Sequence, residues 1–150
     1  MAVVSKEEEE LRKLSVQLRL LEQTAETLQS RISMLNAAKT DLTYADMTLD
    51  GVEKEKKNAE LLVPIGGSSY VKVKLANPDK VVVGLGAGVS VEKTLPEAKA
   101  LLKERLGALE KSMHAAQQQF TQVAERIQTD RNRLESLLAA VRKGNTSGNV

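Results

Sequence analysis

Two long runs of apolar residues, spaced at alternating steps of three and four, constrain the fold of this chain more than any other feature. The first run extends from Leu11 to Leu49 and the second from Leu102 to Val141. A seam with this 3.5-residue repeat is typical of a coiled coil. Because the two runs are of nearly equal length and flank a short segment of another kind, the sequence predicts two helices that fold back antiparallel.

The expected ends of the helices carry capping signals. Ser5 and Thr94 each precede a glutamate by three residues, the spacing of a capping box, so we expect helices over about 5–50 and 95–143. Gly144 follows two cations and is expected to end the second helix. The tail, 144–150, is expected to be disordered. The whole chain, 1–150, is expected to form a single domain.

Residues 51–94 between the helices have a different pattern. The segment begins with charged residues, whose conformation over 51–60 the sequence leaves open. Four short runs rich in β-formers follow, separated by glycine-bearing or Asn-Pro-Asp turns: 61–65, 70–75, 80–85 and 88–93. These runs predict two β-hairpins, with Pro64 at an edge strand or a bulge.

The glycines of "VVVGLGAGVSVEK" do not form a nucleotide-binding loop. Gly84, Gly86 and Gly88 are followed by Val89, where a dinucleotide fingerprint needs its third glycine. The residues that follow alternate apolar and polar like a strand, whereas a phosphate site needs a helix there. A β-hairpin is therefore the expected structure.

Composition limits the possible functions. The chain has three aromatic residues, no cysteine, and 22 basic against 20 acidic residues with the signs interspersed. This composition predicts no enclosed pocket, no thiolate metal site and no nucleic-acid footprint. His114 has no second histidine on its helix face, so we expect no metal, no cofactor and no catalytic residue. With no long apolar segment, we expect a cytoplasmic protein that does not bind membranes.

The fold class expected is α+β: a long antiparallel coiled-coil hairpin of two helices with two small β-hairpins at one end. Four short strands leave open edges and bury too little by themselves, so we expect them to pair with strands of other subunits in an intersubunit β-barrel. The residues expected to mediate this assembly are Leu61, Val63, Ile65, Val71, Val73, Leu75, Val81, Val82, Val83, Val89 and Val91.

Two charges, Lys39 and Asp130, fall at seam positions. A charge in a seam sets the register of a coiled coil at a cost in stability. For Asp130 we add the hypothesis that it weakens the seam near the ends of the helices and leaves apolar residues there partly buried. These residues are Val3, Val4, Leu11, Leu14, Leu134, Leu137, Leu138 and Val141.

The stretches "LLVPIGGSSYVKVKL" and "VVVGLGAGVSVEKTLPEAKALL" resemble the paired hairpin motifs of prefoldin subunits of the alpha class. The similarity covers residues 5–143, and two hairpins distinguish the alpha class from the beta class, which has one. The resemblance implies a hexamer of two alpha-class and four beta-class chains, built on a double β-barrel with six coiled-coil arms. It also implies an ATP-independent chaperone that grips unfolded polypeptides with the arm tips and passes them to a group II chaperonin. The eight partly buried residues named above would then be client contacts.

Three other functions are weighed against this one. A filament-forming gamma-type relative has a similar outline, but it self-associates through its β region. A coiled-coil tether would have no client activity. An enzyme is disfavoured because the sequence lacks clustered histidines, cysteines or paired buried carboxylates.

Overall fold

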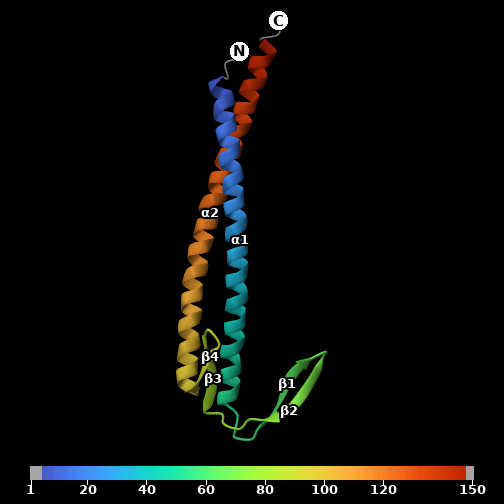
Figure 1. The fold of residues 1–150 in the computed structure, drawn as a ribbon, viewed down its shortest axis with the longest axis vertical. Helices are drawn as coiled ribbons and strands as arrows, with labels where there is room; N and C mark the ends of the chain where they lie inside the picture. Colours follow the sequence, from blue (N-terminus) through green and yellow to red (C-terminus); the bar gives the residue numbers. More distant parts are fainter. Residues whose placement is uncertain (1–4, 148–150) are drawn as a thin grey trace. The chain divides into compact units, whose positions relative to one another are not determined.

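The computed structural model describes residues 5–147. Along the sequence, one long helix precedes four strands and a second long helix follows them (Figure 1). Backbone contacts divide the chain into two compact units: one unit comprises the residues up to Asn36 together with those from Ser112 onward, and the other is Ala37–Lys111. The elements in chain order are α1 (Lys6–Glu53), β1 (Glu60–Gly66), β2 (Ser69–Lys74), β3 (Lys80–Gly86), β4 (Val89–Thr94) and α2 (Leu95–Ser147).

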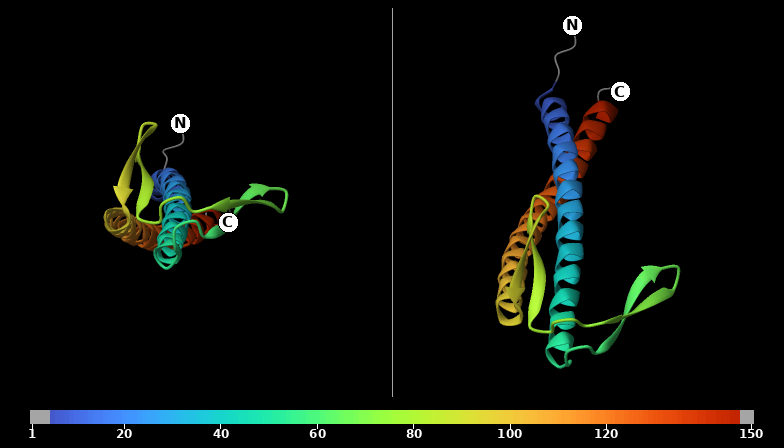
Figure 2. Two further views of the ribbon diagram at one scale, coloured as in Figure 1. Left: turned by 90° about the horizontal axis from the view of Figure 1, so that it is seen from below. Right: turned by 60° about the horizontal axis from the view of Figure 1, so that its bottom comes forward.

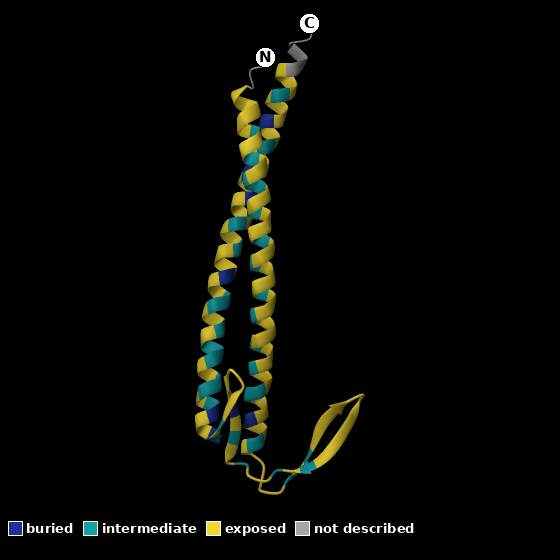
Figure 3. Ribbon diagram, viewed as in Figure 1, coloured by how far each residue is buried: buried dark blue, intermediate teal, exposed yellow. Residues whose placement is uncertain are grey.

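In the first unit, the N-terminal part of α1 and the C-terminal part of α2 lie side by side and antiparallel. Arg131 Nη2 lies 2.9 Å from Glu22 Oε1, and Arg133 Nη2 lies 3.0 Å from Glu10 Oε1, so both ion pairs join the two helices. Buried and half-buried side chains follow the predicted seam on both helices (Figure 3). Ala116, Ile127, Asp130 and Leu137 of α2 are buried. The predicted seam of the coiled coil is therefore confirmed.

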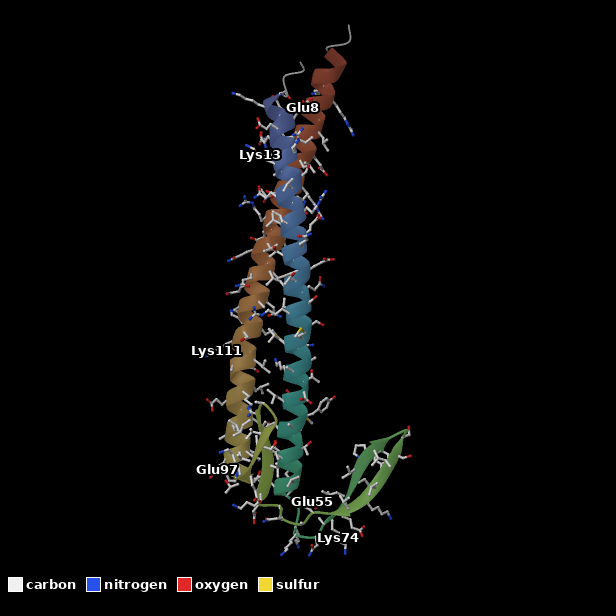
Figure 4. The ribbon with its side chains drawn as sticks, in the orientation of Figure 1. Glu8, Lys13, Glu55, Lys74, Glu97 and Lys111 are labelled. Atoms are coloured by element: carbon white, nitrogen blue, oxygen red, sulfur yellow. The ribbon has the colours of Figure 1, made fainter. Side chains whose placement is uncertain are left out.

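The predicted helix starts are also confirmed. The backbone N–H of Glu8 donates to Ser5 Oγ at 3.2 Å, and that of Glu97 donates to Thr94 Oγ1 at 3.3 Å. Figure 4 labels both glutamates in the first turns of their helices. Each bond satisfies a backbone donor that has no partner within the helix.

The predicted end of the second helix is wrong, because α2 continues through Gly144 to Ser147. Glycine permits the left-handed cap conformation but does not impose it, and no proline follows to interrupt the helix. Helix α1 likewise extends past the fading apolar pattern to Glu53. The expected disorder therefore does not hold for 144–147, and residues 148–150 lie outside the described part.

In the second unit, the four strands form two separate antiparallel hairpins, as the sequence predicted. The two hairpins have matching registers: Val63 pairs with Val71 in the first, and Val83 pairs with Val91 in the second. Each has an irregularity just before the turn, at Pro64/Gly66 in the first hairpin and at Gly84/Gly86 in the second. Of the two alternatives predicted for Pro64, an edge strand or a bulge, the irregularity at Pro64/Gly66 agrees with the bulge.

One hairpin packs on the helices of its own unit. Val83 of β3 joins Leu49 of α1 and Leu95 and Ala98 of α2 in a small buried core. Arg105 of α2 also donates from Nη2 to the backbone oxygen of Gly84 at 2.6 Å. Figure 2 shows β3 and β4 beside the helices from two further directions. This packing fixes β3–β4 to the helical part of the unit.

Candidate functional site

The apolar residues expected near the ends of the helices have three different environments. Leu11, Leu14, Leu134 and Val141 are half-buried, as expected. Leu138 is 37% exposed. Leu137 is only 4% exposed, so the expectation of partial burial is wrong for this residue. It occupies a seam position between the helices, whereas Leu138 lies one residue off the seam. Val3 and Val4 lie outside the described residues.

Asp130 lies buried in the same part of the seam, with 5% of its surface exposed. Its Oδ1 atom accepts a 3.3 Å hydrogen bond from Arg126 Nε, one turn earlier on the same helix. Its Oδ2 atom is buried and has no hydrogen-bond partner among the described residues. A buried acceptor without a partner is destabilising, and the bond to Arg126 does not join the two helices. We therefore expect Asp130 to weaken the seam at this level.

Sequence reasoning missed two exposed apolar residues on α1. Val16 and Leu20 are 56% and 58% exposed. They lie one turn apart on the face opposite the seam, and together with Arg12, Lys13 and Gln17 they line a shallow, almost wholly apolar hollow. Two apolar residues at i and i+4 outside the seam were the signal that could have revealed them.

The residues expected to mediate assembly differ in exposure between the two hairpins. In β1–β2, the side chains of Val63, Ile65 and Val71 are exposed. Those of Leu61 and Val73, together with Leu75 just after β2, are half-buried. The N–H groups of Asn58 and Leu75 donate to Leu75 O and Ala59 O at 2.7 and 2.9 Å, which extends the ladder of this hairpin beyond its strands.

In β3–β4, Val82 and Val89 are exposed, while Val81 and Val91 are half-buried. Val83 is 6% exposed because it packs in the core of its own unit. The expectation that the Val83 side chain faces another subunit is therefore corrected. An apolar face that remains uncovered belongs mainly to β1–β2.

An ion-pair cluster ties the start of α2 to the end of α1. Lys99 Nζ lies 2.7 Å from Asp50 Oδ1 and also contacts Glu53 Oε2. The hydrogen bonds to Asp50 and Glu53 raise the pKa of Lys99 to about 12. The hydrogen bond from Lys99 and its positive charge lower the pKa of Asp50. Both shifts favour the charged pair, which holds the two helices together next to the buried core.

Neither a metal-binding cluster nor a membrane-spanning helix is found among residues 5–147. No group of three or more histidine, aspartate or glutamate side chains there could hold a metal ion. No helix in this part of the chain has a stretch long and apolar enough to span a bilayer. His114 lies exposed on α2, next to the half-buried Met113.

Comparison with known proteins identifies the class to which this architecture belongs. The family model for prefoldin subunits matches residues 21–142, and the chain therefore belongs to the prefoldin family of molecular chaperones. Within that family it is similar to alpha subunits. The prefoldin subunit alpha of Methanosarcina barkeri is 33% identical over 89% of this chain and 96% of its own length.

Solved structures show the same fold. A filamentous PFD from Methanocaldococcus jannaschii, solved by cryo-EM, has a TM-score of 0.64 and 25% identity, covering 74% of this chain and 92% of that one. The crystal structure of the prefoldin beta subunit from Thermococcus strain KS-1 has a TM-score of 0.58 and 18% identity, covering 91% and 96%. The predicted fold class and the resemblance to alpha-class prefoldin are thus confirmed. The intersubunit barrel stays a prediction.

Proposed function

We propose that this chain is the alpha-class subunit of a cytoplasmic, ATP-independent chaperone that holds non-native polypeptides. The observation that carries this proposal is apolar surface near the ends of the helices in a member of the prefoldin family. Leu11, Leu14, Leu134 and Val141 are half-buried there, and Leu138 is more exposed. Unfolded chains expose apolar groups, and their burial is favourable by roughly 25 cal/mol per Å². Several such weak contacts, one set from each subunit, give avidity while each contact stays reversible.

The partners in this proposal are beta-class prefoldin subunits, in a hexamer of two alpha and four beta chains. The exposed residues of β1–β2, among them Val63, Ile65 and Val71, support a role in joining subunits. Two-stranded hairpins are marginal in water and gain stability by pairing or packing further. We propose that the assembled chaperone passes its clients to a group II chaperonin.

A direct test uses the complex reconstituted with a beta-class subunit. Leu138→Ser, which changes an exposed residue near the ends of the helices, should reduce suppression of aggregation of a chemically unfolded model protein by several-fold. Met34→Ser is the matched control, because Met34 is an exposed apolar residue on α1 far along the helix from this end. Suppression that Leu138→Ser leaves intact would favour a coiled-coil tether without client activity.

The filament-forming relative is a second candidate, because one structure with a similar fold is a filamentous PFD. Sedimentation velocity of the chain alone, and after mixing with a beta-class subunit, separates the two assemblies. The alpha-class proposal expects a small species that converts to a discrete hexamer. Long polymers formed by the chain alone would favour the filament.

A further inference from the structure

One surface of α1 combines exposed apolar groups with cations. Arg12, Lys13, Val16, Arg19 and Leu20 are all exposed, and we call them the basic–apolar patch. Residues three and four apart on a helix are neighbours on its surface, so all three cations are neighbours of Val16, and Leu20 is the next residue along the same face. The stems of arginine and lysine are themselves apolar and extend the surface that a ligand could cover.

The cations of the patch have no ion-pair partner in the described part of the chain. Ion pairs of the described residues are instead formed by other cations, among them Lys39, Lys99, Arg126, Arg131 and Arg133. Arg131 and Arg133, for example, bind glutamates of α1 and so join the helices. Glu8 and Glu9 lie three or four residues before Arg12 and Lys13, and with these two carboxylates counted against three cations the patch keeps a net positive charge. Its charges are therefore available to a ligand.

We propose that the basic–apolar patch selects, among non-native polypeptides, segments whose apolar residues are flanked by aspartate or glutamate. This inference rests on the proposed chaperone function and names the class of client segment. Val16 and Leu20 supply apolar contact, and the cations complement the acidic flanks. Charge complementarity of this kind acts mainly on specificity and on association rate.

The extent of the patch favours a short peptide segment over a membrane. The same face of α1 continues with Gln23, Thr27 and Ser30, which are polar and exposed. Binding of a helix to a bilayer surface scales with the apolar area that it buries, and interfacial helices carry a long apolar face. Two apolar residues on one turn match a short segment of a polypeptide chain.

The test compares two fluorescent peptides with the same Leu-Val-Leu-Val centre, one flanked by glutamates and the other by lysines. Their affinities for the reconstituted complex are measured by fluorescence anisotropy. Three exposed ion pairs, each contributing about twofold, predict that the acidic peptide binds roughly tenfold more tightly at low salt. At about 1 M salt the Debye length is about 3 Å, and the preference should largely disappear.

Substitutions assign the preference to the patch. The triple variant R12Q/K13Q/R19Q should bind both peptides about equally. The control K54Q/K56Q/K57Q removes the same charge from exposed lysines elsewhere and should keep the preference. V16S combined with L20S should weaken the binding of both peptides.

The outcomes separate this inference from the function on which it rests. Equal binding of the two peptides by the unmodified complex would overturn the selectivity and leave client binding intact. Failure of both peptides to bind would count against the proposed function itself. Displacement of the acidic peptide by vesicles containing phosphatidylglycerol, but not by neutral vesicles, would overturn the inference in favour of a lipid ligand.

Discussion

Replacing Asp130 with leucine should stabilise the helical pair. The Oδ2 atom of Asp130 is buried without a partner in the described part of the chain, which costs about 1–3 kcal/mol. A buried leucine adds about 1.5–3 kcal/mol from apolar burial. Losing the 3.3 Å bond to Arg126, whose side chain is 60% exposed, costs about 0.5 kcal/mol. Overpacking reduces this stabilisation by about 1–3 kcal/mol, because leucine is larger than aspartate. We therefore expect a net gain of about 2 kcal/mol.

The assay is thermal unfolding of the isolated chain followed by circular dichroism. For a chain of this size, 2 kcal/mol corresponds to a rise in Tm of about 4–8 °C. Asp41→Leu serves as the control, because Asp41 is exposed on α1 and its replacement should change stability by less than about 0.5 kcal/mol. Amide hydrogen exchange adds a local measurement, since protection of the residues around Leu137 should increase.

An unchanged or lower Tm, together with unchanged exchange around Leu137, would refute the reasoning that Asp130 weakens the seam. Asp130→Asn separates the effect of charge from that of polarity. Asparagine has nearly the same shape as aspartate and keeps a polar side chain, but it carries no charge. If asparagine gives the whole gain of leucine, the charge is the cause. A gain only with leucine assigns the effect to apolar packing.

Three further substitutions test other parts of the structure. Val83→Ala should destabilise the isolated chain by about 1.5–2.5 kcal/mol in urea unfolding, because Val83 is 6% exposed, whereas Val63→Ala at the equivalent, 44% exposed position should cost less than about 0.5 kcal/mol. Lys99→Met should lower the Tm at pH 7. The difference in Tm between this variant and the unmodified chain should shrink as the pH falls below 3.8, the ordinary pKa of Asp50. The reason is that the ion pair, which lowers the pKa of Asp50, stabilises the fold only while this carboxyl is ionised. A Tm difference that persists after Asp50 is protonated would contradict this ion-pair assignment. Ala87→Asn should raise stability by about 0.5–1 kcal/mol in thermal unfolding, because Ala87 has a φ of 52° and asparagine adopts this conformation more readily; no gain would show that the turn is not strained.

The helical seam could be predicted from the sequence because its signal is repeated many times. An apolar residue at every third or fourth position leaves one consistent way to bury the stripe, even where Asp130 interrupts it. The two hairpins could also be predicted, since glycine-bearing turns separate their β-rich runs. The end of α2 was not, because Gly144 is compatible with a helix and with a cap alike.

The sequence did not distinguish which hairpin is covered. The two hairpins have equivalent valines, Val63 and Val83, and only the latter is buried. The difference arises from the connections. Strand β4 ends at Thr94 and α2 begins at Leu95, so β3–β4 is held directly against the helix, whereas the segment 54–59 separates β1 from α1. Such a contact depends on tertiary structure, which local patterns do not record.

The equivalence of the hairpins gives a physical reason for assembly. In β3–β4, the face that includes Val83 and Val91 packs on helical side chains of the same unit. In β1–β2, the matching face carries Val63 and Val71, a pair in the same register, and both are exposed. Keeping an apolar face of this kind in contact with water is unfavourable, and its burial would stabilise the protein. We infer that β1–β2 is covered by another subunit as β3–β4 is covered within its own chain, so that one hairpin stabilises the chain and the other joins it to a partner.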